Sequence, residues 1–255
     1  MDGQIVAIDI GNTSTHVALS NTRHAGWERI LRFTPDPRRS ADEWFSMLQP
    51  HFEQSAQPDS VERVICCSVV PAVTGYFLDA AERLWGRTPT VVTSVWPFAI
   101  SIGTDHPELT GVDRLVNGNT AWLQLGGPAI VVDLGTATKI DAVNSDGTFL
   151  GGAIAPGIDL GMGALASGAA QLAKVTLSHP ERTIGANTGD AIRSGVIRGH
   201  ARMIEGLVRD MDAELGQSPS VILTGGAHPL VADQLELDVI LEPTLTLDGL
   251  RLLAV

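Results

Sequence analysis

The stretch VAIDIGNTSTHVAL, residues 6–19, is matched without gaps by IVVDLGTATKIDAV, residues 130–143. Each contains an apolar run that ends in an aspartate and one more apolar residue, then a short turn of Gly, Thr, Ser, Asn or Ala. A second apolar-rich run follows the turn. The match places Asp9 on Asp133 and predicts two β-hairpins of the same design, each with a carboxylate near the end of its first strand.

The distance between the two stretches indicates the domain organisation. Solenoid repeats recur every ~20–50 residues, which is much closer than these two stretches. The 255 residues are enough for one large domain or two of ordinary size. We therefore predict two copies of one domain, residues 1–115 and 116–255.

Each half alternates strand and helix patterns, which favours an α/β fold with mixed sheets flanked by helices. Ser40 and Glu43 form the capping-box pattern that predicts a helix over residues 41–52. The apolar run RVICCSVV predicts a central strand. The remaining predicted elements are helices at residues 74–85, 112–125, 190–215 and 228–235, strands at residues 89–94, 146–157 and 221–226, and an exposed hairpin and loop at residues 22–37.

The charge of the chain restricts its partners. Seventeen basic residues against 29 acidic ones give a net charge of −12. A nucleic-acid-binding surface neutralises phosphates with Lys and Arg, so we do not expect nucleic acid as a partner. One small phosphorylated ligand needs only local amides, a cation and a metal, and the charge does not exclude it.

The cysteines and the apolar runs indicate the compartment. Cys66 and Cys67 are adjacent, and a bridge between neighbours is strained, so we interpret them as reduced residues of a buried strand. No apolar run reaches the roughly 20 residues of a membrane span. The chain begins Met1-Asp2-Gly3 and has no basic leader before its first strand. We expect a cytoplasmic protein without membrane contact.

The turn of the first hairpin, DIGNTST from Asp9, suits a phosphate group. Gly11 lets the backbone turn tightly, and the residues after it offer N–H groups and short polar side chains. Asp9 is placed to hold hydrated Mg²⁺ beside the phosphates. One such turn is also typical of an ordinary hairpin. Because the pattern occurs a second time, as DLGTATK from Asp133, we favour a site in which the two loops hold the β- and γ-phosphates of one nucleotide. Neither loop has the Walker A or GxGxxG pattern.

A third element, VILTGG at residues 221–226, is a strand followed by two glycines. Gly225 and Gly226 would let a flat adenosine lie against the backbone, although many strand-to-helix turns look alike. The order of two hairpins and then strand-Gly-Gly-helix resembles the actin, hexokinase and sugar-kinase superfamily. That resemblance implies two duplicated actin/ribonuclease H-like domains with an ATP cleft between them.

Within that superfamily the sequence resembles the type III pantothenate kinases, which catalyse the first step of coenzyme A biosynthesis. The resemblance implies ATP-dependent phosphorylation of pantothenate to 4′-phosphopantothenate by a homodimer, with the pocket near the subunit interface. It also implies Mg²⁺ and a monovalent cation, K⁺ or NH₄⁺, as cofactors. The resembling segments nearly span the chain in the family's order: DIGNTST from Asp9, CSVVP from Cys67, HPELTGVDR from His106, DLGTATK from Asp133, GGAIAPG from Gly151, IGANTGDAIRSG from Ile184, LTGG from Leu223 and LTLDGL from Leu245.

The resemblance implies a role for individual residues. Asp113 would be the catalytic base, and Asp133 would hold the monovalent cation. ATP would contact the first loop, the second loop and the two glycines, namely Asp9, Ile10, Gly11, Asn12, Thr13, Ser14, Thr15, His16, Thr136, Gly225 and Gly226. Pantothenate would contact Thr104, Gly111, Val112, Asp113, Arg114 and Thr188.

The chemistry of Asp113 and Arg114 agrees with these roles. A carboxylate within hydrogen-bond reach can take the proton of a primary alcohol as it attacks the γ-phosphorus. A guanidinium group can pair with the carboxylate of the substrate. Without the resemblance, the same two residues would fit an ordinary helix start, with the acid near its positive end and a solvated arginine.

Three positions depart from the family pattern. Lys139 and Thr104 stand where a Thr and a Tyr are usual, and Ala169-Ala170 where a Thr-Ala pair is usual. Lys139 either points to solvent, or its ammonium lies beside Asp133 and replaces the monovalent cation or reaches the γ-phosphate.

Thr104 removes an aromatic wall from the pantothenate pocket, which Phe98 or Trp96 could fill instead. These departures leave two other functions open: a nucleotide-binding regulatory or accessory homologue, and a kinase for another small alcohol.

Overall fold

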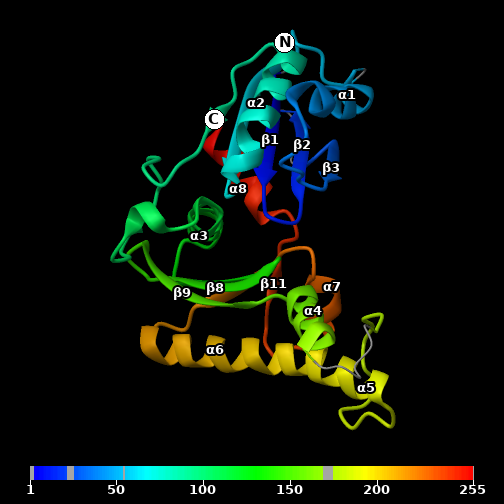
Figure 1. Cartoon of the computed structure of the whole chain (residues 1–255). Helices are drawn as coiled ribbons and strands as arrows, with labels where there is room; N and C mark the ends of the chain where they lie inside the picture. Colours follow the sequence, from blue (N-terminus) through cyan, green and yellow to red (C-terminus); the bar gives the residue numbers. More distant parts are fainter. Residues whose placement is uncertain (1–2, 22–25, 54, 169–174, 255) are drawn as a thin grey trace. The chain divides into compact units, whose positions relative to one another are not determined.

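The computed structural model describes residues 3–21, 26–53, 55–168 and 175–254. They divide into two units, each with its own sheet. The C-terminal helix belongs to the first unit, where Figure 1 shows it in red beside the blue strands. The domain boundary at residue 115 stays a prediction. The first unit comprises Met1–Phe98, His106–Thr120 and Thr246–Val255, and the second comprises Ala99–Asp105 and Ala121–Leu245.

The sheet of the first unit is mixed, as the sequence predicts. Its order is β3-β2-β1-β4-β5, in which β1, β2 and β3 are antiparallel neighbours and β4 and β5 run parallel to β1. The predicted hairpin at residues 22–37 contains β3, and residues 22–25 lie outside the described residues. The strands are β1 (Gln4–Ile10), β2 (Thr15–Asn21), β3 (Arg29–Phe33), β4 (Val61–Ser68) and β5 (Thr90–Val91).

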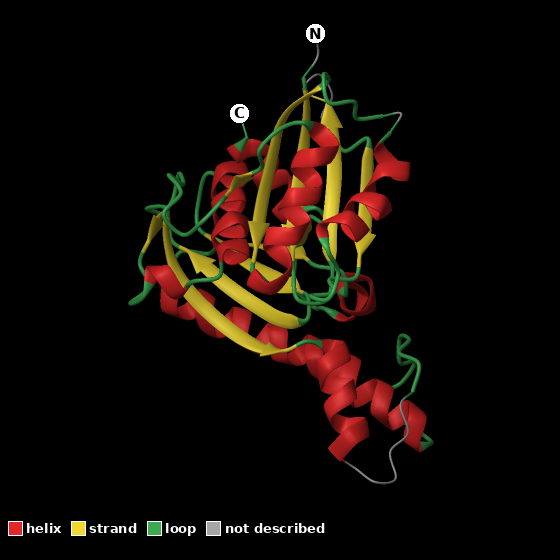
Figure 2. Ribbon diagram, turned by 45° about the horizontal axis from the view of Figure 1, so that its top comes forward, coloured by secondary structure: helices red, strands yellow, loops and turns green. Residues whose placement is uncertain are grey.

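Helices cover both faces of this sheet because successive strand residues point to opposite sides. One face, with Val6 and Ile8, packs against α1 (Ala41–Phe52) and α2 (Pro71–Trp85). The other face, with Ile5, packs against the start of α3 (Val112–Leu125) and against α8 (Leu245–Leu253). Figure 2 shows the red helices beside the yellow strands.

The predicted capping box of α1 is confirmed. Glu43 N donates to Ser40 Oγ at 3.3 Å, and Ser40 N donates to Glu43 Oε2 at 2.8 Å. These bonds satisfy amide groups that a helix start leaves without partners within the helix. Local chemistry therefore decides where α1 begins.

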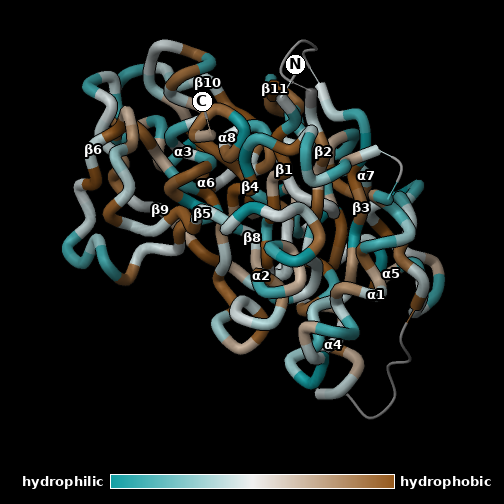
Figure 3. The backbone as a smooth tube through the Cα atoms, turned by 90° about the horizontal axis from the view of Figure 1, so that it is seen from above, coloured by the Kyte–Doolittle hydropathy of each residue, from teal (hydrophilic) through white to brown (hydrophobic). Residues whose placement is uncertain are grey.

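The sheet of the second unit has the order β11-β10-β7-β8-β9-β6. β7, β8 and β9 are antiparallel, while β10 runs parallel to β7. Hydrophobic positions, brown in Figure 3, follow the strands, whereas many connecting turns are teal. The strands are β6 (Ser101–Ile102), β7 (Ala129–Leu134), β8 (Ala137–Val143), β9 (Thr148–Pro156), β10 (Ser220–Thr224) and β11 (Ile240–Leu241).

The long helix predicted at residues 190–215 is interrupted. The chain forms α5 (Thr188–Arg193), a π-helical turn (Ser194–Arg198) and α6 (Gly199–Leu215). α6 lies along one face of the second sheet, where Ala201, Ile204 and Val208 join its hydrophobic cluster (Figure 1). The helix predicted at residues 228–235 is α7 (His228–Val231) followed by a 3₁₀ turn (Ala232–Gln234), and another 3₁₀ turn spans Pro107–Leu109.

The helix α4 (Ile158–Gly168) was not predicted from the sequence. Its three glycines, of which the last ends it, lower helix propensity by nearly 1 kcal/mol each. Ala169 and Ala170 lie outside the described residues. No helix in the described part of the chain is long and apolar enough to cross a membrane.

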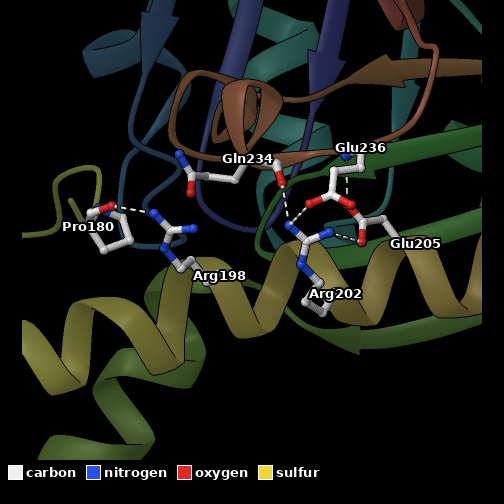
Figure 4. A network of polar contacts seen from close by, with 6 residues as sticks. All are labelled: Pro180, Arg198, Arg202, Glu205, Gln234 and Glu236. Carbon is white, nitrogen blue, oxygen red and sulfur yellow. Dashed lines mark hydrogen bonds and ion pairs between the residues drawn. The ribbon is translucent and has the colours of Figure 1, made fainter. Parts of the chain in front are cut away.

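A network of ion pairs, of which only Glu205 is buried, links α6 to the segment before β11. Arg202 pairs with Glu205 and, at 2.8 Å, with Glu236 (Figure 4). Glu236 N also donates to Glu205 Oε1 at 2.7 Å. Nearby, Arg198 Nη2 donates to the Pro180 carbonyl oxygen at 2.9 Å. Through these contacts, the two arginines connect separate segments of the second unit.

Candidate active site

The first predicted phosphate loop joins β1 to β2. Asp9 and His16 are register partners, and His16 Nδ1 lies 3.6 Å from Asp9 Oδ2. Gly11 N donates to the Ser14 carbonyl oxygen at 2.9 Å, which closes the turn. Asn12 and Thr13 are exposed in this turn, whereas Gly11 and Ser14 are half-buried. The turn therefore presents polar groups beside a strand-end carboxylate.

Three predicted contact residues have buried side chains. Ile10 packs in the hydrophobic cluster under α1 and α2, and Val112 packs in the cluster of the opposite face. Only the backbone of either residue is suited to a polar ligand. The Thr15 hydroxyl is buried and has no hydrogen-bond partner among the described residues.

Cys67 lies level with Asp9 on the neighbouring parallel strand β4. Its Sγ donates to Asp9 Oδ1 at 3.4 Å. Both cysteines are free and buried, which confirms that they are reduced residues of a buried strand. Burial raises the pKa of the Cys67 thiol well above its usual value, and the negative charges of Asp9 and Asp113 raise this pKa further. The contact between Cys67 and Asp9 was not predicted from the sequence.

Residues 111–114, which are predicted to contact pantothenate, lie at the start of α3. Asp113 lies in the first helical turn, and Arg114 N donates to Asp113 Oδ1 at 2.9 Å. A Cβ added to Gly111 would lie 2.7 Å from Asp113 Oδ1, so a side chain at this position would displace the Asp113 carboxylate. Val112 packs in the same hydrophobic cluster as Cys67, on the face of the sheet that α3 covers. Asp113, the next residue, therefore lies on the same face of the sheet as Asp9 and Cys67.

The second predicted phosphate loop joins β7 to β8. Asp133 and Lys139 are register partners, and Lys139 Nζ lies 2.7 Å from Asp133 Oδ2. The two side chains are largely buried, with exposed fractions of 15% for Asp133 and 17% for Lys139. Lys139 therefore lies beside Asp133 and does not point to solvent.

The register corrects the match between the two hairpins. Strand pairing ends at Ile10 and Thr15 in the first hairpin, but at Leu134 and Thr138 in the second. The second turn is thus one residue shorter. The gapless alignment equates Lys139 with Thr15, whereas in the paired strands Lys139 corresponds to His16.

Two glycines fit tightly around the second loop. Gly225 has a φ of 89°, and a Cβ there would lie 2.5 Å from Leu134 N. Gly226, by contrast, is exposed and has open space around it. Gly157 N donates to the Thr136 carbonyl oxygen at 3.0 Å, and a Cβ at Gly157 would lie 2.3 Å from that oxygen. Gly157 was not predicted as a site residue, although it ends the quoted GGAIAPG segment.

Thr188 is exposed at the start of α5 and lines a cavity of about 620 Å³. His200, which the sequence analysis did not single out, also lines it, and its Nε2 lies 2.7 Å from Thr138 Oγ1. Burial lowers the pKa of His200. The other lining residues are mostly apolar or glycine: Pro156, Gly157, Ile158, Gly161, Leu165, Ala191, Ile192, Gly195, Val196, Gly199 and Met203.

Thr104 belongs to the second unit and is half-buried. A Cβ added to Gly151, whose φ is 93°, would lie 3.4 Å from Thr104 Cγ2. Trp96 and Phe98 pack against the first unit's hydrophobic cluster that contains Cys67. Both aromatic rings therefore have a packing role in that unit. No group of three or more His, Cys, Asp or Glu within the described ranges could hold a metal ion.

Solved structures support the predicted fold. A Campylobacter jejuni protein named as a Baf family transcriptional activator has a TM-score of 0.59 at 17% identity, covering 97% of this chain and 96% of that one. An inorganic polyphosphate/ATP-glucomannokinase from an Arthrobacter strain has a TM-score of 0.52 at 13% identity, covering 98% of both chains. A glucokinase from an Antarctic psychrotroph also has a TM-score of 0.52, at 11% identity, covering 100% of this chain and 99% of that one. The predicted sugar-kinase-like α/β fold is confirmed.

Sequence comparisons identify the family. A sequence profile described as type III pantothenate kinase matches residues 5–210. The type III pantothenate kinase of Acidothermus cellulolyticus is 40% identical over 252 residues, which cover 98% of this chain and 97% of that protein. The protein of the same name from Gluconobacter oxydans is 39% identical over 252 residues, covering 98% and 92%. The chain belongs to the type III pantothenate kinase family.

Proposed function

We propose that this protein uses ATP to phosphorylate pantothenate to 4′-phosphopantothenate, the first step of coenzyme A biosynthesis. Membership of the family over nearly the whole chain supports the reaction. The observation that carries the assignment of residues is the position of Asp113. It begins the helix that packs on the sheet face where Asp9 and Cys67 lie.

Asp113 acts as the general base in this proposal. The pantothenate hydroxyl oxygen attacks the γ-phosphorus of ATP, its proton passes to an Asp113 carboxylate oxygen, and ADP leaves. Arg114, the next residue, pairs with the pantothenate carboxylate through its guanidinium fork. The absence of a side chain at Gly111 keeps the approach to Asp113 open. Thr104, Val112 and Thr188 complete the proposed substrate contacts.

The first loop contacts ATP phosphates through its backbone N–H groups and polar side chains. Mg²⁺ often binds through one carboxylate together with substrate phosphates and several waters. The single carboxylate of Asp9 fits that requirement, and the turn from Gly11 to Ser14, in which Asn12 and Thr13 are exposed, supplies the polar surroundings. In the second unit, Thr136 and the backbone at Gly225 and Gly226 are the proposed nucleotide contacts.

The residues around Asp133 do not fit a monovalent cation. The ammonium group of Lys139 already lies 2.7 Å from Asp133 Oδ2, and a second cation there would be repelled by it. We propose that Lys139 replaces K⁺ or NH₄⁺, so that the enzyme needs no added monovalent cation.

The assembly and the location of the enzyme are also proposals. Leu150, Ile154 and Leu160 are large apolar residues whose exposed fractions are 45%, 61% and 53%. They lie on β9 and α4 of the second unit, and association with a second copy would remove their apolar surface from water. We propose a homodimer that works in the cytoplasm.

A coupled assay of ADP release tests the proposed reaction. The wild type should turn over pantothenate, and Asp113→Asn should lose at least ~100-fold in kcat because its amide cannot accept the proton. Thermal unfolding and ATP binding of the variant should stay near the wild-type values. Near-normal turnover by Asp113→Asn would remove its role as base.

The same assay separates the other two functions. A panel of small alcohols replaces pantothenate in parallel reactions. Turnover with another alcohol alone would identify a different kinase, whereas ATP binding without any turnover would identify a regulatory or accessory protein.

A further inference from the structure

The carboxylate of Asp9 is contacted on both of its oxygens by neighbouring strands. Oδ1 accepts from Cys67 Sγ at 3.4 Å, and Oδ2 lies 3.6 Å from His16 Nδ1. Cys67 comes from β4 and His16 from β2, the two strands that flank β1. Asp9 is therefore placed from both sides of its own strand.

The thiol of Cys67 contributes a proton to this contact. Its side chain has an exposed fraction of 0%, and a thiolate there would be a buried charge next to a carboxylate. A thiol is a weak donor, but one that points at an ionised oxygen still favours a particular carboxylate orientation.

We infer that Cys67 is a positioning residue for the nucleotide site, whose thiol holds the Asp9 carboxylate in the orientation that receives Mg²⁺ with ATP. This inference rests on the role of Asp9 in the proposed function. Cys67 itself touches neither metal nor substrate. It acts through Asp9, as the hydrogen-bond partners of metal ligands generally do.

Cys66 provides a matched control within the same strand. It is also 0% exposed, but it belongs to the cluster on the α1 and α2 side of the sheet, whereas Cys67 belongs to the cluster with α3 and α8. Cys66 Sγ contacts the Cys67 carbonyl oxygen at 3.4 Å. Replacing either cysteine with alanine removes the same buried volume, and only one replacement removes the contact with Asp9.

The experiment measures ATP binding by calorimetry at a series of Mg²⁺ concentrations, without pantothenate, for the wild type and three variants. Cys67→Ala should raise the half-saturating Mg²⁺ concentration about tenfold, the lower end of the usual effect of such partners. Cys67→Ser retains a hydroxyl donor and should recover most of this loss. Cys66→Ala should stay within about twofold of the wild type. Thermal unfolding without ligand reports any common packing defect.

Equal shifts in Cys67→Ala and Cys66→Ala, or no shift in Cys67→Ala, would overturn the positioning role. Pantothenate turnover by the wild type is measured separately. If turnover is present and the Mg²⁺ dependence does not respond to Cys67→Ala, the inference fails and the proposed function stands. If turnover is absent and the Mg²⁺ dependence responds as expected, the proposed reaction fails and the positioning role stands.

Discussion

Lys139 Nζ lies 2.7 Å from Asp133 Oδ2, directly across the second hairpin. His16 takes the corresponding place opposite Asp9 in the first hairpin, at 3.6 Å. Each hairpin therefore places a basic side chain across from the aspartate near the end of its first strand. In the second hairpin that group is a primary ammonium within ion-pair distance.

Lys139 should make the enzyme independent of K⁺ and NH₄⁺. Initial rates of the wild type in buffers without either ion should equal those with the ion present. In Lys139→Thr the carboxylate of Asp133 loses its ion pair with Lys139. The rate without added cation should therefore fall at least ~10-fold, and K⁺ should restore part of it.

Lys139→Arg is the control for this prediction, because it keeps the positive charge on a side chain of similar reach. Its rate should show no dependence on K⁺. A wild type that strictly requires K⁺ or NH₄⁺ would show that Lys139 does not replace the cation.

Gly225 should not tolerate a side chain. Its positive φ is unfavourable for alanine, and the added Cβ would lie 2.5 Å from Leu134 N and 2.6 Å from Asp133 Oδ1. Gly225→Ala should lower the free energy of unfolding by ~1–3 kcal/mol, which is the usual cost of a strained backbone position. It should also weaken ATP binding. Chemical denaturation and calorimetry measure the two effects.

Gly226→Ala is the matched control, since a Cβ at Gly226 meets no atom within 4 Å and its φ is not positive. It should change the free energy of unfolding by less than ~0.5 kcal/mol. Equal destabilisation by the two variants would contradict the steric explanation.

His200 should make the protein less stable in mild acid. Burial lowers the pKa of its imidazole, so the unfolded chain, with the ordinary value near 6.5, binds more protons than the folded protein below that pH. The free energy of unfolding should therefore decrease as the pH falls from about 6.5 towards the lowered value. Above about pH 7 this contribution disappears because the residue is neutral in both states.

Thermal unfolding of His200→Gln at several pH values measures this contribution. The decrease in melting temperature between about pH 6.5 and 5 should be smaller than in the wild type. His179→Gln, at an exposed position, should keep the wild-type slope. If the melting temperature of His200→Gln decreased with pH as steeply as that of the wild type, groups other than His200 would cause the acid sensitivity.

Local sequence patterns predict much of the fold. The capping box of Ser40 and Glu43 predicts the start of α1, and the repeated Asp-apolar-Gly pattern predicts both hairpins. These signals act within a few residues, so they are readable without the tertiary structure. α4 escapes prediction because its glycines weaken the helical signal, although packing still forms the helix.

The surroundings of the two aspartates follow less directly from the sequence. One residue fewer in the second turn shifts the register, so Lys139 pairs with Asp133 and corresponds to His16 instead of Thr15. The alternation of a buried strand implies that Cys66 and Cys67 face opposite sides, but it does not show which of them meets Asp9.

By itself, the sequence determined the α/β class, the duplicated hairpins and the family, because these depend on local periodicity and on motifs in order along the chain. Only the tertiary structure decided which groups surround each aspartate. One partner of Asp9 is Cys67, 58 positions away and on another strand, and the pairing of Asp133 with Lys139 depends on the length of one turn. Strand pairing creates such contacts, because hydrogen bonding between strands sets which distant residues lie level with one another.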